Sequence, residues 1–357
     1  MLPTTPLPGR GAATNPVHRY TRVARDDFDD GWSAELEDLP PLKTTLTAEQ
    51  STSIISRNQS PDVPFEQSVN PYRGCEHGCV YCFARPSHAW LDLSPGLDFE
   101  TRLFYKANAV EQLEAELRQP KYVCKPISLG INTDAYQPIE KQLGLTRRLL
   151  ELLLEYRHPV TILTKGITIL RDLDLLEQLA QQNLVSVSVS LTTLNDALKR
   201  RMEPRTASPA ARLRVLRALK GIGIEPGVLV APVIPQINDR EIEAILEAAA
   251  AAGAVRAGYV VLRLPHELKG LFREWLEAHY PERAAHVMSL VRQMRGGKDY
   301  DASFGSRMRG NGALAVLLHN RFRIACRRLG LNEDDAPTLD TTRFHRPLRS
   351  GDQIGLF

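Results

Sequence analysis

Three cysteines lie within eight residues of one another, in the segment NPYRGCEHGCVYCFARP. They are Cys75, Cys79 and Cys82, and the chain has two others, Cys124 and Cys326. At this cysteine frequency a C-x3-C-x2-C pattern is expected by chance on the order of 10⁻³ times in the chain. An odd and clustered set does not suit a disulfide framework. The spacing therefore predicts that the three thiols bind metal.

Two kinds of metal centre are compatible with these residue types. Three thiolates on one loop can occupy three corners of a cubane iron–sulfur cluster and leave the fourth iron open, and Gly74 and Gly78 suit a loop that wraps closely around such a core. The alternative is a Cys3His zinc site with His77 as the fourth ligand. Zinc ligands typically come as well-separated pairs, whereas here all four fall within eight residues. His77 also lies between two ligands, where its ring is hard to turn inward, so the pattern favours iron and sulfur.

The composition is that of an ordinary globular protein. The chain has 357 residues, 43% of them hydrophobic and 24% charged, which excludes a disordered chain, a collagen and a disulfide miniprotein. With 45 basic and 42 acidic residues, any basic patch must be local. No apolar stretch is long enough to span a membrane, and the N-terminus lacks the apolar core of a signal peptide. We therefore expect a cytoplasmic protein that does not enter a membrane.

Strand-like and helical patterns alternate from residue 66 onward. Strands are predicted at 66–74, 126–134, 159–165, 184–192, 225–234 and 257–264, and helices at 107–118, 141–156, 172–182, 207–220 and 239–252. Asn238 followed by Glu241 predicts a capping box at the start of the last of these helices. The alternation implies parallel strands joined by right-handed crossovers. Six such units predict an α/β fold with a partial (β/α)6 TIM-type barrel, whose active-site mouth lies at the carboxyl ends of the strands.

The chain divides into three predicted parts. Residues 1–65 are proline-rich, carry an acidic block of seven carboxylates between Asp26 and Asp38, and are predicted to form an N-terminal arm that packs on the body in places. Residues 66–270 are the predicted core. Residues 271–357 form a predicted helical C-terminal extension, with helical patterns at 268–279, 283–295 and 311–329.

The cysteine motif, directly after the first strand of a six-unit partial barrel and with Tyr81 before its third cysteine, resembles the radical S-adenosylmethionine (radical SAM) superfamily. The resemblance covers roughly residues 66–270. It implies a [4Fe-4S] cluster held by Cys75, Cys79 and Cys82, whose unique iron chelates S-adenosylmethionine. It further implies an enzyme in which reductive cleavage of that cofactor yields a 5′-deoxyadenosyl radical that abstracts hydrogen from a substrate. An electron donor such as a flavodoxin or ferredoxin is implied as a partner.

Three further segments are similar to the spore photoproduct lyase-like branch, often called DNA repair photolyase-like. They are TDAYQPIE (133–140), TKG (164–166) and SVSLTT (188–193), each at the end of a predicted strand. The resemblance implies that the cofactor contacts a set of polar side chains: Thr133, Lys165 and Ser190 at its methionine and ribose ends, Asn132 and Asp134 at its amino group, Tyr81 beside its adenine and Arg205 at its carboxylate. Each of these residues taken alone is also a reasonable strand-end or helix-capping residue.

Two positions depart from the lesion-repair pattern. Ile131 stands where the lyase has its hydrogen-donor cysteine, and Phe83 lacks the hydroxyl that a tyrosine would bring to a radical relay. Cys124 precedes its strand, so it is expected near the opposite end of the barrel. These departures argue against thymine-dimer chemistry, and Cys124 and Cys326 are expected to be small buried apolar residues.

A basic region bears on the class of substrate. Eight basic residues and one acidic residue, Glu203, lie between Lys199 and Lys220. Such a run is either a solvated helix face or a surface that tracks phosphates. We therefore rank nucleic-acid repair or modification first, with a peptide or small-metabolite substrate as the alternative. A zinc-stapled nucleic-acid-binding module is the alternative from another class of protein.

Overall fold

A computed structural model describes residues 7–21, 43–333 and 338–349 of the chain. The acidic block predicted between Asp26 and Asp38 lies outside these ranges.

Seven strands form the main sheet, in the order β10-β9-β8-β7-β6-β3-β2. The six strands from β3 to β10 in this sheet pair in parallel, and β2 pairs antiparallel with β3 at the edge. The strands are β2 (Ile55–Arg57), β3 (Gln67–Val69), β6 (Ile127–Leu129), β7 (Val160–Thr164), β8 (Val185–Ser190), β9 (Gly227–Val233) and β10 (Arg256–Val261). Sequential strands are neighbours throughout, which confirms the predicted partial (β/α)6 barrel.

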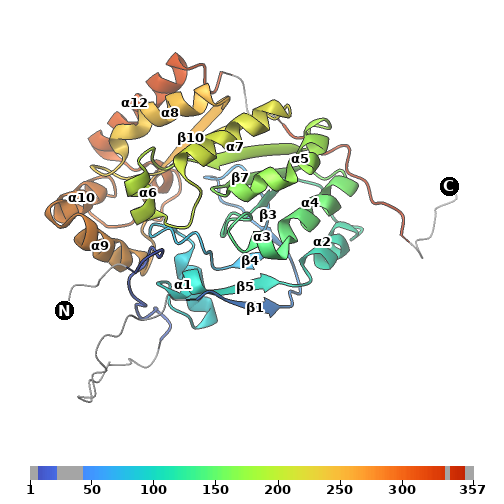
Figure 1. Cartoon of the computed structure of the whole chain (residues 1–357), viewed down its shortest axis with the longest axis horizontal. Coiled ribbons are helices and arrows are strands. Elements are labelled where there is room, and N and C mark those ends of the chain that lie inside the picture. The colour runs from blue at the N-terminus through green and yellow to red at the C-terminus, as the bar shows by residue number, and fades with distance from the viewer. Residues whose placement is uncertain (1–6, 22–42, 334–337, 350–357) are drawn as a thin grey trace.

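Helices between successive strands cover the outside of this sheet (Figure 1). They are α2 (Ala109–Leu117), α3 (Glu140–Leu143), α4 (Leu145–Glu155), α5 (Leu173–Ala180), α6 (Asp196–Met202), α7 (Pro209–Gly221) and α8 (Ile242–Ala251), with 3-10 turns η1 (Arg85–Leu91), η2 (Ile167–Asp172) and η3 (Asp239–Glu241). Ser208 caps α7 by accepting a hydrogen bond from the Ala211 amide, and Asn195 caps α6 in the same way. The apolar faces of most of these helices bury leucine, isoleucine and valine side chains against the strands in one large core, whereas α6 packs in a second cluster with α9 and α10.

The first predicted strand, 66–74, is broken in two. β3 ends at Val69, and the chain leaves the main sheet through Asn70 and Pro71, a proline having no amide to donate to the ladder. β4 (Tyr72–Arg73) then joins a second sheet, where it pairs antiparallel with β5 (Arg102–Lys106). Because of this change of sheet, the backbone that leads into the cysteine loop is paired first in the main sheet and then in the small sheet.

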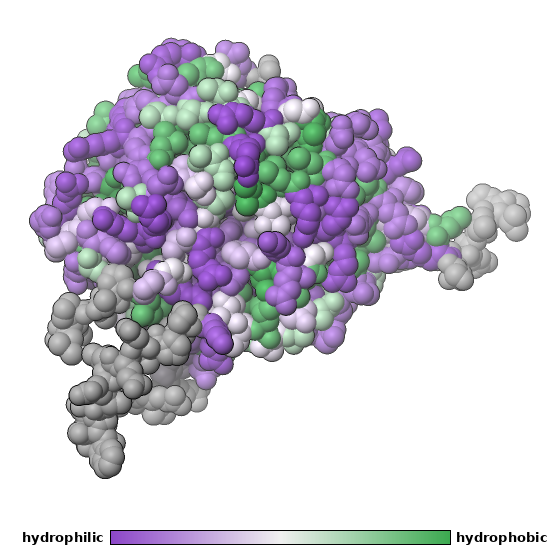
Figure 2. Space-filling model, viewed as in Figure 1, coloured by the Kyte–Doolittle hydropathy of each residue, from purple (hydrophilic) through white to green (hydrophobic). Residues whose placement is uncertain are grey.

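Residues 43–65, predicted as part of an arm, contain two strands. β1 (Thr45–Glu49) pairs in parallel with β5 in the small sheet, and β2 extends the main sheet. Beyond the barrel, α9 (Leu268–His279), α10 (Pro281–Gln293) and α12 (Gly312–Arg328) match the three predicted C-terminal helices, and α1 (Asp98–Thr101) and α11 (Ser306–Arg309) are short helices of four residues each. Among the described residues no helix is long and apolar enough to cross a bilayer. Figure 2 shows that the surface in this view is largely hydrophilic, with the largest group of hydrophobic residues in its upper half and smaller groups below.

Candidate active site at the barrel mouth

The cysteine loop follows β4 and lies at the carboxyl ends of the parallel strands. Gly74 opens it at φ +77° and Gly78 lies within it at φ +67°, both in the left-handed region that favours glycine. A Cβ atom at Gly74 would lie 2.6 Å from the Leu103 side chain and 2.9 Å from the Phe99 carbonyl oxygen. The loop thus packs closely on the small sheet, and the Cys75 amide donates to the same Phe99 carbonyl at 2.9 Å.

The three predicted ligands are free thiols on this one loop. Cys75 and Cys79 are buried and Cys82 is half-buried. Burial raises the pKa of Cys79 to about 12, although the nearby Lys165 ammonium opposes that rise. Burial and the neighbouring Asp134, Cys79 and Cys82 raise the pKa of Cys75. Thiols this buried need a bound cation to ionise, and binding to iron would supply it. The donor set therefore fits an iron–sulfur cluster.

The arrangement does not fit the zinc alternative. The Nδ1 atom of His77 lies 3.4 Å from the Asp134 carboxylate, so this ring nitrogen already has a partner within the protein. In the part of the chain that the structure describes, no three His, Cys, Asp or Glu side chains converge closely enough to hold a single metal ion. A cubane cluster is wider than one ion and holds its ligands further apart, so three thiols on one loop suit it better.

Tyr81 anchors the loop to a buried network that the sequence did not indicate. Its hydroxyl donates to Glu203, and Thr192 lies 3.2 Å away. Glu203 also accepts from Arg212, and both side chains are almost fully buried. Burial alone would raise the pKa of Glu203, but Arg212 and Lys165 outweigh it and lower that pKa, so the carboxylate stays ionised.

Lys165 extends from the end of β7 toward this network. Its Nζ lies 6.0 Å from the centre of the Tyr81 ring. Burial lowers the pKa of Lys165, but Cys79, Glu203 and Asp134 together raise it, so the ammonium is retained. A fixed positive charge beside the buried thiols would offset part of the negative charge of thiolate ligands.

The other residues predicted to contact the cofactor lie at neighbouring strand ends. Thr133 and Ser190 are buried, with their hydroxyls 3.2 Å from the Tyr72 carbonyl and 3.5 Å from the Ala231 carbonyl. Asn132 is exposed, and its backbone N–H donates to the side-chain oxygen of Asn70. These positions share the mouth with the cysteine loop, and their roles toward a cofactor stay predictions.

Asp134 and Arg205 are already engaged with protein groups. The Asp134 carboxylate accepts from the Thr164 hydroxyl at 2.7 Å and the Lys165 amide at 2.7 Å, besides facing His77. Arg205 pairs with Glu76 of the cysteine loop at 3.1 Å, and its side chain is 39% exposed. Asp134 therefore ties the ends of β6 and β7 to the cysteine loop, whatever else it contacts.

The basic region is less of a surface than its sequence indicates. Arg212 is buried in the Glu203 ion pair, and Lys199 is buried with its Nζ donating to the Pro204 carbonyl at 2.9 Å. Arg200, Arg201, Arg205, Arg214, Arg217 and Lys220 remain exposed. Away from the mouth, Cys326 is buried as expected, while Cys124 is half-buried against the core.

A family model of the radical SAM superfamily matches residues 69–249, half of the chain and most of the predicted core. The chain belongs to the radical SAM superfamily. The family implies a [4Fe-4S] cluster, S-adenosylmethionine and a source of electrons. This match confirms the family and the enzyme class that the resemblance implied.

Relatives of this radical SAM enzyme occur in Mycobacterium tuberculosis and in Methanocaldococcus jannaschii. The uncharacterized protein Rv2578c of Mycobacterium tuberculosis is 40% identical over 233 residues, which are 65% of this chain and 68% of that protein. The uncharacterized protein MJ0683 of Methanocaldococcus jannaschii is 29% identical over 214 residues, 60% of this chain and 76% of that protein. Among solved structures, spore photoproduct lyase complexed with dinucleoside spore photoproduct has a TM-score of 0.56 at 17% identity, over 80% of each chain. That likeness shows a shared fold.

Proposed function

We propose that this radical SAM enzyme holds its cluster through Cys75, Cys79 and Cys82 and modifies or repairs a nucleic acid. The observation that carries the first half is the placement of three free thiols on the loop after the first parallel strand, at the barrel mouth. When bound there, the reduced cluster and S-adenosylmethionine supply a 5′-deoxyadenosyl radical that abstracts a substrate hydrogen. The chain supplies binding, orientation and exclusion of water.

The strand-end residues are suited to a zwitterionic nucleoside. Lys165 and Arg205 carry fixed positive charge beside the loop, and Asn132 is exposed for hydrogen bonding. The buried hydroxyls of Thr133 and Ser190 line neighbouring strand ends. We propose that these five residues, with Tyr81 and Asp134, contact or orient S-adenosylmethionine.

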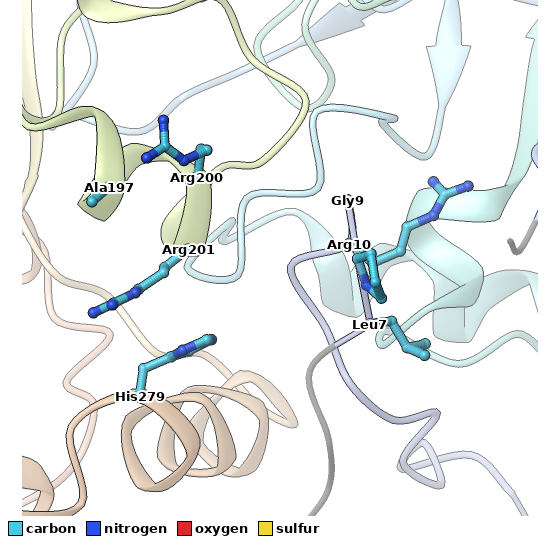
Figure 3. Close-up of a pocket in the computed structure, with 8 residues that line it drawn as sticks. Leu7, Gly9, Arg10, Ala197, Arg200, Arg201 and His279 are labelled. Carbon is cyan, nitrogen blue, oxygen red and sulfur yellow. The ribbon is translucent and has the colours of Figure 1, made fainter. Parts of the chain in front are cut away.

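A basic pocket beside the loop supports the nucleic-acid substrate (Figure 3). It has a volume of about 300 Å³ and lies between residues 7–10, α6 and the end of α9. Its lining includes the guanidinium groups of Arg10, Arg200 and Arg201 and the ring of His279, whose pKa is lowered by burial, and no described acidic residue lines it. Neither Arg200 nor Arg201 pairs with a carboxylate of the described chain. Arg201 contacts the hydroxyl and ring of Tyr280 instead, so both charges are available to a phosphate.

The pocket adjoins the cysteine loop. The last residue of α6, Met202, accepts a hydrogen bond from the Val80 amide at 2.9 Å. A phosphate held by Arg200 and Arg201 would therefore lie on the same element that borders the loop. A contact of this kind to the backbone would position the nucleic acid without reading its sequence.

Anaerobic reconstitution tests the first half of the proposal. We expect a brown protein with about four iron and four sulfide per chain that loses its colour on reduction with dithionite and forms 5′-deoxyadenosine from S-adenosylmethionine. We propose a flavodoxin or a ferredoxin as the physiological electron donor, to be tested in place of dithionite. A colourless protein with one zinc per chain would favour the zinc-stapled binding module instead.

Salt-dependent binding to DNA and RNA oligonucleotides tests the second half. Replacing Arg200 and Arg201 together by Ala should lower the slope of log affinity against log salt by about two, one for each arginine that no longer neutralises a phosphate. The matched control replaces Arg327 and Arg328, which are exposed on α12 and lie outside the basic region 199–220, and should leave the slope unchanged. No binding at low salt would contradict a nucleic-acid substrate and favour a peptide or small metabolite.

A further inference from the structure

The described part of the N-terminal arm crosses the back of the cysteine loop. The Gly11 and Ala12 amides donate to the two carboxylate oxygens of Glu100, at 3.0 and 2.8 Å. Arg10 donates to the Glu100 carbonyl at 3.0 Å. Glu100 is fully buried, so part of the hydrogen bonding that a buried carboxylate requires comes from a segment remote in sequence.

Gly11 touches the backbone of the loop itself. A Cβ atom built at Gly11 would lie 1.7 Å from the Gly78 carbonyl oxygen and 3.2 Å from the Val80 amide nitrogen. A second crossing lies further along the arm, where a Cβ at Gly96 would lie 2.0 Å from the Thr14 carbonyl oxygen. Only glycine fits at these two positions, so the backbone of the arm is in direct van der Waals contact with the segments that it crosses.

Glu100 connects this contact to a ligand position. The fully buried Arg85 pairs with the same carboxylate, and its Nε donates to the Cys79 carbonyl at 2.8 Å. Its Nη1 donates to the Gly96 carbonyl at 2.8 Å. One guanidinium thus joins Cys79, the Gly96 crossing and the carboxylate that the arm binds.

The arm continues to the far edge of the open barrel. The Thr14 hydroxyl donates to Glu274 of α9 at 2.7 Å, and Arg19 pairs with Glu267 at 2.9 Å. Glu267 follows β10, the last strand of the main sheet. The cysteine loop follows β3, the first parallel strand of that sheet, by way of β4. Residues 10–19 therefore join the two edges of the partial barrel on its mouth side.

We propose that residues 10–19 are a strap that fixes the cysteine loop around its cluster, with Glu100 and Arg85 as positioning residues that carry the strap's contact to Cys79. The inference rests on the proposed role of the three cysteines as cluster ligands. With the strap in place, Cys79 and Gly78 are covered from behind and the loop has one conformation. With the strap displaced, the back of the loop is open to water and to oxygen, and the cluster is short-lived.

Gly11→Ala tests the strap with the smallest possible change, because its Cβ meets backbone that cannot swing aside. Gly221→Ala is the control, since a Cβ at Gly221 meets nothing within 4 Å and its φ is ordinary. In the metal-free protein under anaerobic conditions, we expect Gly11→Ala to speed alkylation of Cys79 and proteolysis of the arm at least tenfold, which is about 1.4 kcal/mol in the equilibrium between closed and open strap. After reconstitution, the brown colour should fade in air faster by a similar factor.

Glu100→Gln provides a second variant of nearly the same shape, in which an amide NH2 faces amide donors. It should accelerate the same two reactions even if Gly11→Ala fails to fold. Wild-type rates of alkylation and arm proteolysis in both variants would overturn the proposal. So would a variant in which proteolysis shows the arm to be displaced but the reconstituted cluster fades in air no faster than in the wild type. If the wild-type chain takes up no iron, the ligand assignment fails, and the alkylation and proteolysis rates still decide whether the strap holds the loop.

Discussion

Tyr81 and Glu203 form a buried hydrogen bond between the cysteine loop and the residue that follows α6. Because Glu203 is also the partner of Arg212 of α7, this contact joins the loop to the helices after β8. The loop is therefore held from two sides, by Glu203 at the mouth and by Glu100 behind.

Removing Glu203 should destabilise the protein far more than removing its tyrosine partner. Glu203→Ala leaves the Arg212 guanidinium buried without a carboxylate, which costs about 3–5 kcal/mol. Tyr81→Phe removes one hydrogen bond and costs about 1 kcal/mol. Urea unfolding of the metal-free variants measures both free energies. Equal changes in the two variants would show that the ion pair is not the dominant interaction.

Replacing Lys165 should lower the rate of cofactor cleavage more than it lowers the iron content. Lys165→Met keeps the length of the side chain and removes its charge, so it should retain iron while lowering the rate of 5′-deoxyadenosine formation about tenfold or more, the value of one charged hydrogen bond. Lys220→Met, at an exposed position of α7, is the control. A normal rate in Lys165→Met would remove this residue from the cofactor site.

Gly78 offers a test of the close packing behind the loop. Its φ is +67°, and a Cβ there would lie 2.7 Å from a Glu100 carboxylate oxygen. Gly144 has a similar φ of +60° with nothing within 4 Å. Gly144→Ala should therefore cost only the left-handed backbone penalty, about 1–2 kcal/mol, and keep its iron. Gly78→Ala should cost more and lose iron, and identical iron contents would contradict the packing of Glu100 against the loop.

The stability of the protein should fall as the pH decreases from about 6.5 toward 4. Burial lowers the pKa of His158 to about 4, and the ring is bonded to the Tyr122 hydroxyl at 2.7 Å. The unfolded chain, with an ordinary histidine pKa, takes up the proton first, so the stabilisation present above pH 6.5 is lost at up to about 1.4 kcal/mol per pH unit. Burial lowers the pKa of His88 in the same way, also to about 4.

Thermal unfolding of the metal-free protein as a function of pH separates these two histidines. His158→Gln should reduce the slope between pH 6.5 and 4 by about half and leave the His88 contribution in place. A slope unchanged by that substitution would mean that His158 is not buried as a neutral ring.

The sequence predicts the parts of this molecule that follow local rules. Alternating patterns located all six parallel strands, and the cysteine spacing located the loop at the mouth. The break at Pro71 was not predicted, because 66–74 has the pattern of one strand until its tertiary partners, β3 on β6 and β4 on β5, are known. β5 and α6 were missed for the same reason, being short elements fixed by their neighbours.

Contacts between residues that are remote in the sequence could not be predicted from local patterns. Glu203 stands in the MEPR segment and Arg212 in a run of arginines, yet nothing local shows that the two are buried together. The predicted capping box is wrong: Asn238 accepts from the Ile234 amide, and Glu241 accepts from the Leu194 amide and the Thr193 hydroxyl, so both residues join loops at the mouth. At this position, hydrogen bonds to loop residues replace the local capping bonds that the sequence pattern predicts.

The central claim, that Cys75, Cys79 and Cys82 hold a cluster that cleaves S-adenosylmethionine, is tested most directly by iron content and 5′-deoxyadenosine yield in Cys79→Ala beside Cys326→Ala. Both cysteines are buried and reduced, so the two variants differ in position rather than in chemistry. We predict that Cys79→Ala is colourless and forms no 5′-deoxyadenosine, whereas Cys326→Ala matches the wild type in both. Cofactor cleavage that persists in Cys79→Ala would contradict the assignment.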